Sequence, residues 1–310
     1  MNNIKVTFLN PPYLKNYSRP QRSPSVTKSG TLYFPMWLSY AAGYTGQGGH
    51  EIDLIDAPAT GLQEHEVIEL IRAFSPRLLA VDTSTPSIFN DARFCGLVRK
   101  EIPDVVIIMV GTHVSALPEW SLMLNAAIDA IAIGEYDITI KEIADALSIG
   151  DDYTRVAGIC YRDDTDKPLK SEARKPIKDL DSLPMVSSVY RHFLDIRNYF
   201  NPNALFPMVT ITTSRGCPHH CTFCVYPQTM TGHKVRLRSV DNLVAEIEFI
   251  ARSFPEVKSI FFEDDTFAAN KSRCQQICRE IIRRNIHIAW TANARADLDQ
   301  ETMRIMRNAG

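Results

Sequence analysis

Short apolar runs alternate with amphipathic stretches through the first 150 residues, and this alternation restricts the fold more than any other feature of the sequence. Each run has the length of a buried strand, and each stretch has the spacing of a helix with one apolar face. Five such units predict a doubly wound (flavodoxin-like) α/β domain, with a mostly parallel sheet covered by helices on both faces. The predicted strands are residues 4–9, 51–55, 78–82, 105–110 and 130–133. The predicted helices lie near residues 36–44, 64–74, 92–101, 119–125 and 137–147.

The carboxyl ends of these strands carry small and polar residues. Ligands of doubly wound sheets bind at this edge, and small residues let the backbone approach a bulky ligand closely. The same residue types also form ordinary turns, so a binding edge and plain turns are both open interpretations. The positions are Asn10-Pro11-Pro12, Asp56, Thr83-Ser84-Thr85, Gly111-Thr112-His113 and Gly134-Glu135. A long loop over residues 10–35 follows the first strand, and a loop of this length is either functional or mobile.

A more polar, Pro-punctuated segment over residues 151–207 predicts a small hairpin and a connecting arm. The βα alternation then restarts, with strands predicted near residues 208–213, 258–262 and 287–291. Three parallel strands with outer helices would leave an open edge, so we expect a barrel-like domain that is truncated at residue 310. The predicted domains are therefore residues 1–150, 151–207 and 208–310.

Three cysteines crowd into a C-x3-C-x2-C loop directly after the strand at residues 208–213: Cys217, Cys221 and Cys224. Thiolates ligate iron, and three ligands leave one iron of a four-iron cluster open to a substrate. The alternative is a zinc site with His219, His220 or His233 as fourth ligand.

Four further cysteines are predicted to be structural. Cys274 and Cys278 lie on the apolar face of a predicted helix, and free cysteine is commonly buried as a small hydrophobic residue. Cys95 and Cys160 are isolated in the sequence and receive the same interpretation. The odd total of seven does not fit a secreted disulfide framework.

Composition and charge describe an ordinary globular protein. The net charge is −2 without a long basic run, which gives no indication of a nucleic-acid partner. No apolar stretch approaches the roughly 20 residues of a membrane helix, and the N-terminus lacks the features of a signal peptide. We therefore expect a cytoplasmic protein without a transmembrane segment.

The run Arg215-Gly216-Cys217-Pro218-His219-His220-Cys221-Thr222-Phe223-Cys224 resembles the signature of the radical S-adenosylmethionine (radical SAM) superfamily. The resemblance implies a partial (β/α) barrel and a [4Fe-4S] cluster that binds S-adenosylmethionine and cleaves it to a 5′-deoxyadenosyl radical. It also implies cofactor contacts for Phe223, for Glu263 or Asp264 with the methionine amino group, and for Arg295 with the carboxylate. The acids replace a Gly-Gly-Glu-like element of the superfamily, which leaves open which of them binds.

A doubly wound domain in front of such a barrel is similar to the cobalamin-binding class of the superfamily. The Asp-x-His-x-x-Gly motif that supplies a cobalt ligand elsewhere is absent, which favours a pocket or turn role for His113 over a ligand role. The resemblance implies cofactor contacts from Asn10, Ser84, Thr85, Gly111, Thr112, His113, Gly134 and Glu135. Residues 226–239 and 262–267 look like a hopanoid-biosynthesis subgroup.

The expected function is radical activation of a C–H bond, with cobalamin as second cofactor and either methyl transfer or a ring rearrangement as outcome. The implied partners are a small-molecule substrate, including lipid or isoprenoid-derived compounds, and an electron donor such as flavodoxin or ferredoxin. Two alternatives are a tRNA methylthiotransferase and a non-catalytic cobalamin- or metal-binding module. The first has three cysteines in its N-terminal domain, where residues 1–200 have only Cys95 and Cys160. If the barrel is incomplete, residues 1–310 alone should form little 5′-deoxyadenosine.

Overall fold

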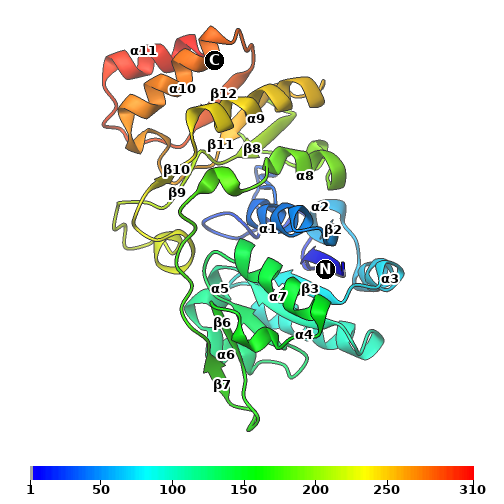
Figure 1. Ribbon diagram of the computed structural model, residues 1–310. Helices are drawn as coiled ribbons and strands as arrows, with labels where there is room; N and C mark the ends of the chain where they lie inside the picture. Colours follow the sequence, from blue (N-terminus) through cyan, green and yellow to red (C-terminus); the bar gives the residue numbers. More distant parts are fainter. Residues whose placement is uncertain (1–2) are drawn as a thin grey trace.

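The computed structural model describes residues 3–310 and contains two large sheets. In Figure 1, the first sheet and its helices, coloured blue to green, occupy the lower part of the view. The second sheet lies above it with its yellow-to-red helices, and the C-terminus lies at the upper end. The two βα alternations of the sequence therefore correspond to two separate sheets.

The first sheet has seven strands in the order β2-β1-β3-β4-β5-β6-β7. Strands β1 to β5 are parallel, and the order 2-1-3-4-5 is that of the flavodoxin-like doubly wound fold. The predicted fold class of this domain is confirmed. The parallel strands are β1 (Lys5–Asn10), β2 (Glu51–Asp56), β3 (Leu78–Asp82), β4 (Val106–Val110) and β5 (Ala130–Ala132).

Helices bury both faces of this sheet. On one face, Leu38 of α1 and Ile143 of α7 belong to the same buried cluster as the strand residues. On the other face, Val67 of α3 and Phe94 of α4 do the same. The central strand β3 is consequently buried along its whole length, as expected for a parallel strand covered on both sides. The helices are α1 (Met36–Gln47), α2 (Ala57–Thr60), α3 (Glu64–Phe74), α4 (Ile88–Glu101), α5 (Thr112–Ala116), α6 (Pro118–Leu122), α7 (Asp137–Ile149) and the 3-10 turn η1 (Tyr153–Arg155).

The hairpin predicted after residue 150 is present as β6 (Ile159–Arg162) and β7 (Pro168–Lys170). It extends the first sheet, because β6 pairs antiparallel with the free edge of β5. Pairing satisfies backbone groups that an open edge would leave exposed. The first sheet therefore reaches past residue 150, and the division at 150 and 207 stays a prediction.

The connecting arm lies between the two domains. Helix α8 (Val186–Phe193) contacts α1 of the first domain and α9 of the second (Figure 1). Phe34, just before α1, packs against Tyr190 and Tyr199 of the arm, at centroid distances of 4.5 and 4.0 Å. The arm also contains the turns η2 (Leu180–Ser182) and η3 (Ile196–Asn198).

The second sheet has three parallel strands in the order β12-β11-β8, each followed in the chain by a helix. Ser239 and Asp299 cap the helices that follow them, as their side chains predict. The strands are β8 (Met208–Ile211), β11 (Ser259–Phe262) and β12 (Ala289–Ala292). The remaining elements are a ribbon of β9 (Ser214–Arg215) and β10 (Arg236–Leu237), the π-helical turn η4 (Pro227–Thr231), the turn η5 (Phe267–Ala269), and helices α9 (Val240–Ser253), α10 (Lys271–Arg283) and α11 (Gln300–Asn308).

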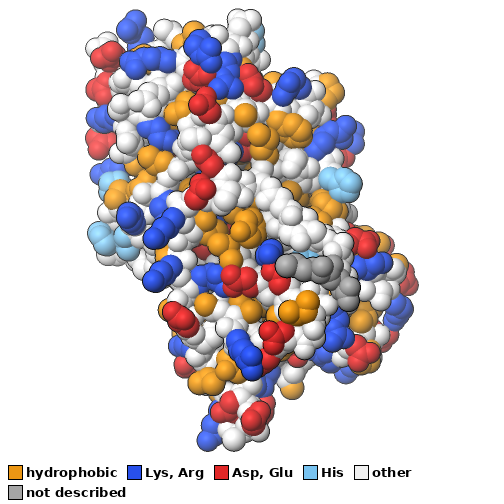
Figure 2. All heavy atoms as spheres, viewed as in Figure 1, with side chains coloured by type: hydrophobic (Ala, Val, Ile, Leu, Met, Phe, Trp, Pro, Cys, Tyr) orange, Lys and Arg blue, Asp and Glu red, His pale blue; other side chains and the backbone are white. Residues whose placement is uncertain are grey.

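The structure can be compared with two further predictions, one for the four cysteines outside the loop and one for membrane-spanning helices. Cys274 and Cys278 are fully buried in the core of the second domain, and Cys95 and Cys160 are buried in the first, as predicted. Among the helices of residues 3–310, none combines the length and the apolar character that crossing a membrane requires. On the face drawn in Figure 2, side chains of both charge signs are intermixed over both domains.

Candidate functional site

The cysteine loop is closed at its base by the β9–β10 ribbon. Arg215 pairs with Arg236 across the ribbon, and Gly216 then opens the loop with a φ of +95°. A Cβ at Gly216 would lie 2.3 Å from the carbonyl oxygen of Lys234, so only glycine fits this position. The Cys217 amide donates to the Gly232 carbonyl at 3.1 Å, which joins the two sides of the loop.

All three loop cysteines have free thiols, with Cys217 and Cys224 half-buried and Cys221 exposed. Among residues 3–310, no three His, Cys, Asp or Glu side chains lie close enough together to hold a metal ion. The loop thus carries three cysteine side chains of the kind that ligate Fe–S clusters, and its base is closed. The three sulfur atoms do not meet at one point.

Two histidines beside the loop are engaged with each other rather than with the cysteine sulfurs. The rings of His220 and His233 stack at 4.1 Å, and His233 Nδ1 lies 3.1 Å from the Cys217 carbonyl oxygen. Phe223, at the tip, is 89% exposed. The structure therefore places Phe223 on the surface of the loop, and its cofactor contact stays a prediction.

The two acids that directly follow β11, Glu263 and Asp264, have different surroundings. Asp264 is fully buried and accepts hydrogen bonds from the backbone amides of Thr213 and Ser214, at 2.6 and 3.1 Å. Its carboxylate therefore fixes the turn after β8, and its contact with a cofactor stays a prediction. Glu263 instead lines a cavity between the two domains, together with Asp265, Ser214 and residues of the 10–35 loop.

Arg22, from the 10–35 loop, lines the same cavity. Its Nη1 atom lies 2.7 Å from Glu263 Oε1, and its Nη2 atom lies 3.2 Å from Asp265 Oδ1. Burial raises the pKa of Glu263 to about 7, although the neighbouring Arg22 guanidinium opposes this shift. The second oxygen of Glu263, Oε2, is buried without a hydrogen-bond partner. This orphaned acceptor fits a cationic ligand group such as the amino group of S-adenosylmethionine.

Arg295 lies elsewhere. Its side chain is half-exposed after β12 and lies 3.8 Å from Asp297. It is absent from the lining of the cavity that contains Glu263. The structure therefore does not place Arg295 in the same cavity as Glu263, and its contact with the methionine carboxylate stays a prediction.

At the carboxyl edge of the first sheet, the ends of β3 and β4 approach closely. Gly111 has a φ of +115°, and a Cβ there would lie 2.5 Å from the Thr83 carbonyl oxygen. His113, in α5, which begins at Thr112, has its Nδ1 atom 3.0 Å from the Thr85 hydroxyl. Its Nε2 atom is buried without a partner, and burial lowers its pKa. A neutral ring with an unpaired nitrogen fits the edge of a polar cofactor such as cobalamin.

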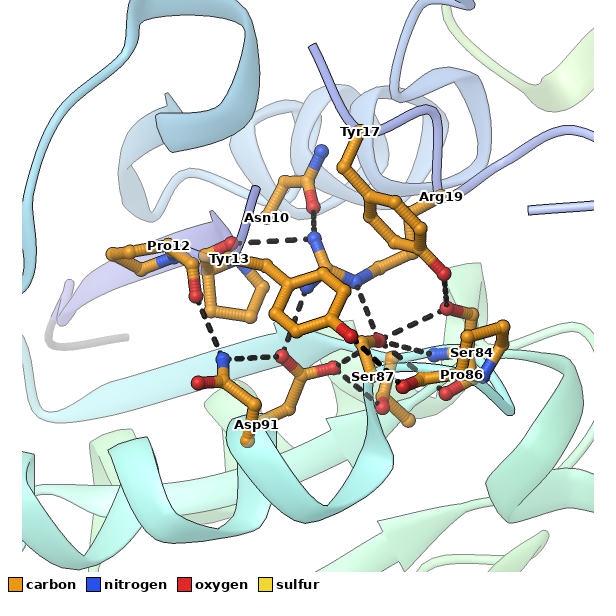
Figure 3. Close-up of polar contacts among 12 residues, drawn as sticks. Asn10, Pro12, Tyr13, Tyr17, Arg19, Ser84, Pro86, Ser87 and Asp91 are labelled. Atoms are coloured by element: carbon orange, nitrogen blue, oxygen red, sulfur yellow. Dashed lines mark hydrogen bonds and ion pairs between the residues drawn. The ribbon is translucent and has the colours of Figure 1, made fainter. Parts of the chain in front are cut away.

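Asn10 and Ser84, two other predicted contacts, belong to a polar cluster between the ends of β1 and β3 (Figure 3). The Arg19 guanidinium fills this cluster, donating to Asn10 Oδ1, to Asp91 Oδ1 at 2.8 Å and to Ser87 Oγ at 3.2 Å. Asn10 also donates to Asp56, and Ser84 Oγ lies 2.8 Å from the Tyr17 hydroxyl. The side chains of Asn10 and Ser84 thus have hydrogen-bond partners within the protein, and their contacts with a cofactor stay predictions.

Glu135 is likewise occupied. Its carboxylate accepts two hydrogen bonds from Arg236, at 2.8 and 2.5 Å, and one from the Ile177 amide at 3.1 Å. Two residues further on, Asp137 accepts two from Arg215, at 2.8 and 3.0 Å. We call these four side chains, Glu135, Asp137, Arg215 and Arg236, the clamp. The cofactor role predicted for Glu135 stays a prediction beside this contact, and a Cβ at Gly134, where φ is +75°, would lie 3.9 Å from the Thr229 carbonyl oxygen.

The clamp joins the β5–α7 turn of the first domain to the base of the cysteine loop. The side chains of all four residues are at most 8% exposed. The Arg215 guanidinium also packs over the rings of Trp37 and Tyr40, at 4.7 and 5.0 Å from their centroids. The predicted cobalamin edge and the predicted cluster loop are therefore held together by buried, paired charges.

Sequence reasoning missed Arg19, Arg22, Asp91 and Asp137 as members of these networks. The only local signals are the spacing of Glu135 and Asp137 and the placement of Arg215 beside the first cysteine. Neither signal indicates which residue is contacted, because the two members of each arginine–acid pair lie between 72 and 241 residues apart in the sequence.

The fold and the loop together define a class: a B12-type doubly wound domain followed by a radical SAM domain. Comparison with protein families agrees, since residues 22–144 match the B12 binding domain and residues 211–310 match the radical SAM superfamily. The chain therefore combines a match to a B12 binding domain with a match to the radical SAM superfamily, in the order that the fold shows.

Among similar proteins, an uncharacterized methyltransferase of Pyrococcus horikoshii is 30% identical over 91% of this chain and 60% of its own length. An anaerobic magnesium-protoporphyrin IX monomethyl ester cyclase of Rubrivivax gelatinosus is 27% identical over 89% of this chain and 50% of its own length. The chain thus spans between half and 60% of these two relatives.

Two solved structures share the fold. The cobalamin-dependent radical enzyme OxsB, with aqua-cobalamin and S-adenosylmethionine bound, has a TM-score of 0.78 at 18% identity, over 99% of this chain and 43% of its own. The radical S-adenosylmethionine methyltransferase TsrM of Kitasatospora setae has a TM-score of 0.72 at 16% identity, over 99% of this chain and 58% of its own.

Proposed function

We propose that this chain is the cofactor-binding part of a cobalamin-dependent radical SAM enzyme that activates a C–H bond of a small molecule. The observation that carries the proposal is the clamp, which fixes the cysteine loop beside the carboxyl edge of a B12-type domain. When bound, a [4Fe-4S] cluster and S-adenosylmethionine supply a 5′-deoxyadenosyl radical, and cobalamin supplies a methyl group or assists a rearrangement.

The residues divide the binding work between them. Cys217, Cys221 and Cys224 would ligate three irons, and Glu263 would accept the amino group of S-adenosylmethionine. Thr85, Gly111, Thr112, His113 and Gly134 would contact cobalamin at the first sheet. The contribution of the protein is to bind and orient both cofactors and to exclude water between them, while the cofactors perform the chemistry.

Methyl transfer is favoured as the reaction by the relatives, which include a cobalamin-dependent radical SAM methyltransferase, TokK, of Streptomyces tokunonensis. Ring formation or rearrangement is the second candidate, because the cyclases match 89% or more of this chain. A lipid or isoprenoid-derived substrate and a flavodoxin or ferredoxin donor complete the proposal. Free thiols at all seven cysteines support a reducing, cytoplasmic compartment.

Anaerobic reconstitution with iron, sulfide and hydroxocobalamin tests this function. We expect iron and sulfide in cluster stoichiometry, a visible cobalamin spectrum, and loss of the cluster absorption alone in Cys221→Ala. Cys160→Ala is the matched control, since Cys160 is buried far along the chain from the loop and should leave the cluster intact. After reduction, 5′-deoxyadenosine should form slowly with residues 1–310 and not at all with Cys221→Ala. A protein that takes up zinc but no iron would contradict the proposal.

A further inference from the structure

The arm between the two domains runs along the base of the cysteine loop. The Arg236 guanidinium donates to the Ile177 carbonyl oxygen at 2.6 Å, and the Ser239 amide donates to the Asp181 carboxylate at 2.9 Å. Residues 175–181 of the arm therefore lie beside β10, the strand that closes the base of the loop. Figure 1 shows the green arm passing the yellow loop.

Three exposed lysines surround this contact, and we call them the lysine patch: Lys175, Lys178 and Lys234. The first two flank Ile177 in the arm, and the third comes two residues before the arginine that bonds to it. The carbonyl oxygen of Lys234 packs against Gly216, directly before the first cysteine of the loop. In Figure 2, Lys, Arg and His side chains gather at the left of the view, where the loop and the arm lie in Figure 1.

The charges of the lysine patch are not used inside the protein. Within residues 3–310 none of its ammonium groups forms an ion pair, whereas Lys170 of the same arm pairs with Glu119 at 2.9 Å. Asp179, the acid next to Lys178 in sequence, instead accepts a hydrogen bond from the Asp181 amide at 3.0 Å and caps the turn η2. The patch therefore presents positive charge that only a partner molecule can balance.

The surrounding sequence strengthens this positive charge. No Asp or Glu occurs between Asp195 and Asp241, the stretch that contains the whole cysteine loop. The 10–35 loop, whose Pro20 carbonyl oxygen accepts from the Tyr226 hydroxyl, has no acid either. On a chain whose net charge is −2, the face around the loop thus differs in sign from the molecule as a whole, which favours association with a negatively charged surface.

The lysine patch suits a transient protein contact. Its lysines come from two segments and are all exposed, so they can meet a broad acidic surface rather than enclose a small anion. Leu237, on β10, keeps 39% of its surface exposed and supplies an apolar contact beside them. Complexes between electron-transfer proteins are of this kind, with small interfaces and charge complementarity that speeds association.

We propose that the lysine patch is the docking surface of an acidic one-electron carrier protein. This inference rests on the proposed function, since it concerns the supply of electrons to the cluster that the same loop would hold. One electron leaves the reduced carrier, which is oxidised, and enters the oxidised cluster ligated by Cys217, Cys221 and Cys224, which is reduced. No covalent bond forms or breaks in this step.

The test measures the binding of an acidic flavodoxin to the chain at low ionic strength, by titration of the flavin fluorescence. Reversing the charge of the whole patch, with Lys175→Glu, Lys178→Glu and Lys234→Glu combined, should weaken the complex by about 10- to 100-fold. Salt at ~0.5 M should remove most of this difference, because it screens the charges.

The matched control reverses three other exposed lysines that form no ion pair among the described residues: Lys100, Lys167 and Lys258. Its net charge equals that of the patch variant, so it should weaken the complex by less than about threefold, the contribution of the overall field. Equal losses in the two variants would overturn the inference, since the effect would then come from net charge alone. Binding of tRNA that the patch variant loses, with flavodoxin binding unchanged, would also overturn it.

Reduction of the iron-loaded chain gives a second readout. Reduced flavodoxin should reduce the cluster more slowly in the patch variant than in the control, while dithionite, which needs no docking surface, should reduce both at the same rate. A slower reaction with both reductants would contradict docking at the patch. A wild-type chain that assembles no cluster would instead contradict the proposed function, because the binding of flavodoxin is measured without the cluster.

Discussion

Two sets of arginine–carboxylate contacts join the domains, and they differ in how completely their polar atoms are paired. In the clamp, each arginine makes a two-pronged contact with one acid, and the side chains are at most 8% exposed. In the Arg22 contact, the arginine is 37% exposed and Glu263 keeps one buried oxygen unpaired. Both connect elements far apart in the chain, yet only the second has capacity left for another ligand.

The difference separates a fixed contact from an exchangeable one. A buried and fully paired set of charges cannot release one partner without leaving the other uncompensated, which is strongly unfavourable. A half-exposed arginine can be resolvated at little cost. The clamp therefore sets the position of the cysteine loop, and the Arg22 contact is the more easily exchanged of the two.

Removing one acid of the clamp should have the largest effect on stability. Asp137→Ala leaves the buried Arg215 guanidinium with only Glu135 at 3.9 Å, and we expect it to lower the free energy of unfolding by about 3 kcal/mol. Urea denaturation measures this change. The matched control is Asp297→Ala, which removes the exposed partner of Arg295 and should cost about 0–1 kcal/mol. Equal losses in the two variants would remove the distinction between the contacts.

The pH dependence of stability should show the incomplete pairing of Glu263. Burial raises its pKa to about 7, with Asp264 and Asp265 adding to the shift and Arg22 opposing it. An acid whose pKa is raised on folding stabilises the fold at low pH, and this contribution is lost as the pH rises from about 4.5 to about 7. Glu263→Gln should therefore be the more stable protein at pH 8, by on the order of 2 kcal/mol, and gain nothing at pH 4.

A second variant gives the opposite sign. The half-buried Glu280 has its pKa lowered to about 2 by Arg283 and Arg284, so its contribution is present above pH 4.5 and is lost as the pH falls toward 2. Thermal midpoints of both variants are measured against wild type from pH 3 to pH 8: Glu263→Gln should gain relative stability as the pH rises toward 8, and Glu280→Gln should lose its deficit as the pH falls toward 3. A flat difference curve for Glu263→Gln would contradict the unpaired state of its carboxylate.

Arg22→Gln should have the smallest effect on stability. Because the Arg22 side chain is 37% exposed, the ion pair is screened by water, and we expect a loss of about 1 kcal/mol or less in urea denaturation. A stability loss close to that of Asp137→Ala would show that the Arg22 contact stabilises the fold as strongly as the clamp does.

Much of the fold follows from local patterns. The helix predicted at residues 64–74 has these bounds as α3, because Gln63 and Glu66 form a capping box at its start. The parallel strands of both sheets could be predicted from their apolar runs. The hairpin was predicted as a local element, but its pairing with β5 depends on an edge that forms only when the sheet assembles.

The site was less predictable, for a physical reason. Cys217, Cys221 and Cys224 share one loop, so their spacing alone indicates their chemistry. The sequence around Glu135 does not distinguish a contact with a cofactor from a contact with Arg236. Arg236 reaches Glu135 only when the chain is folded. Likewise, Arg22 gives no sign in the sequence that it lies against Glu263, 241 residues away.

The β9–β10 ribbon has a consequence for how the protein matures. It ties residues 216–235 into a loop whose ends are already joined before any iron arrives, so the entropy of bringing those ends together is lost during folding. A cluster bound by Cys217, Cys221 and Cys224 would then have to order only the tip of the loop, where Cys221 is exposed. Part of the conformational entropy of a cluster-binding loop would thus be lost on folding rather than on binding.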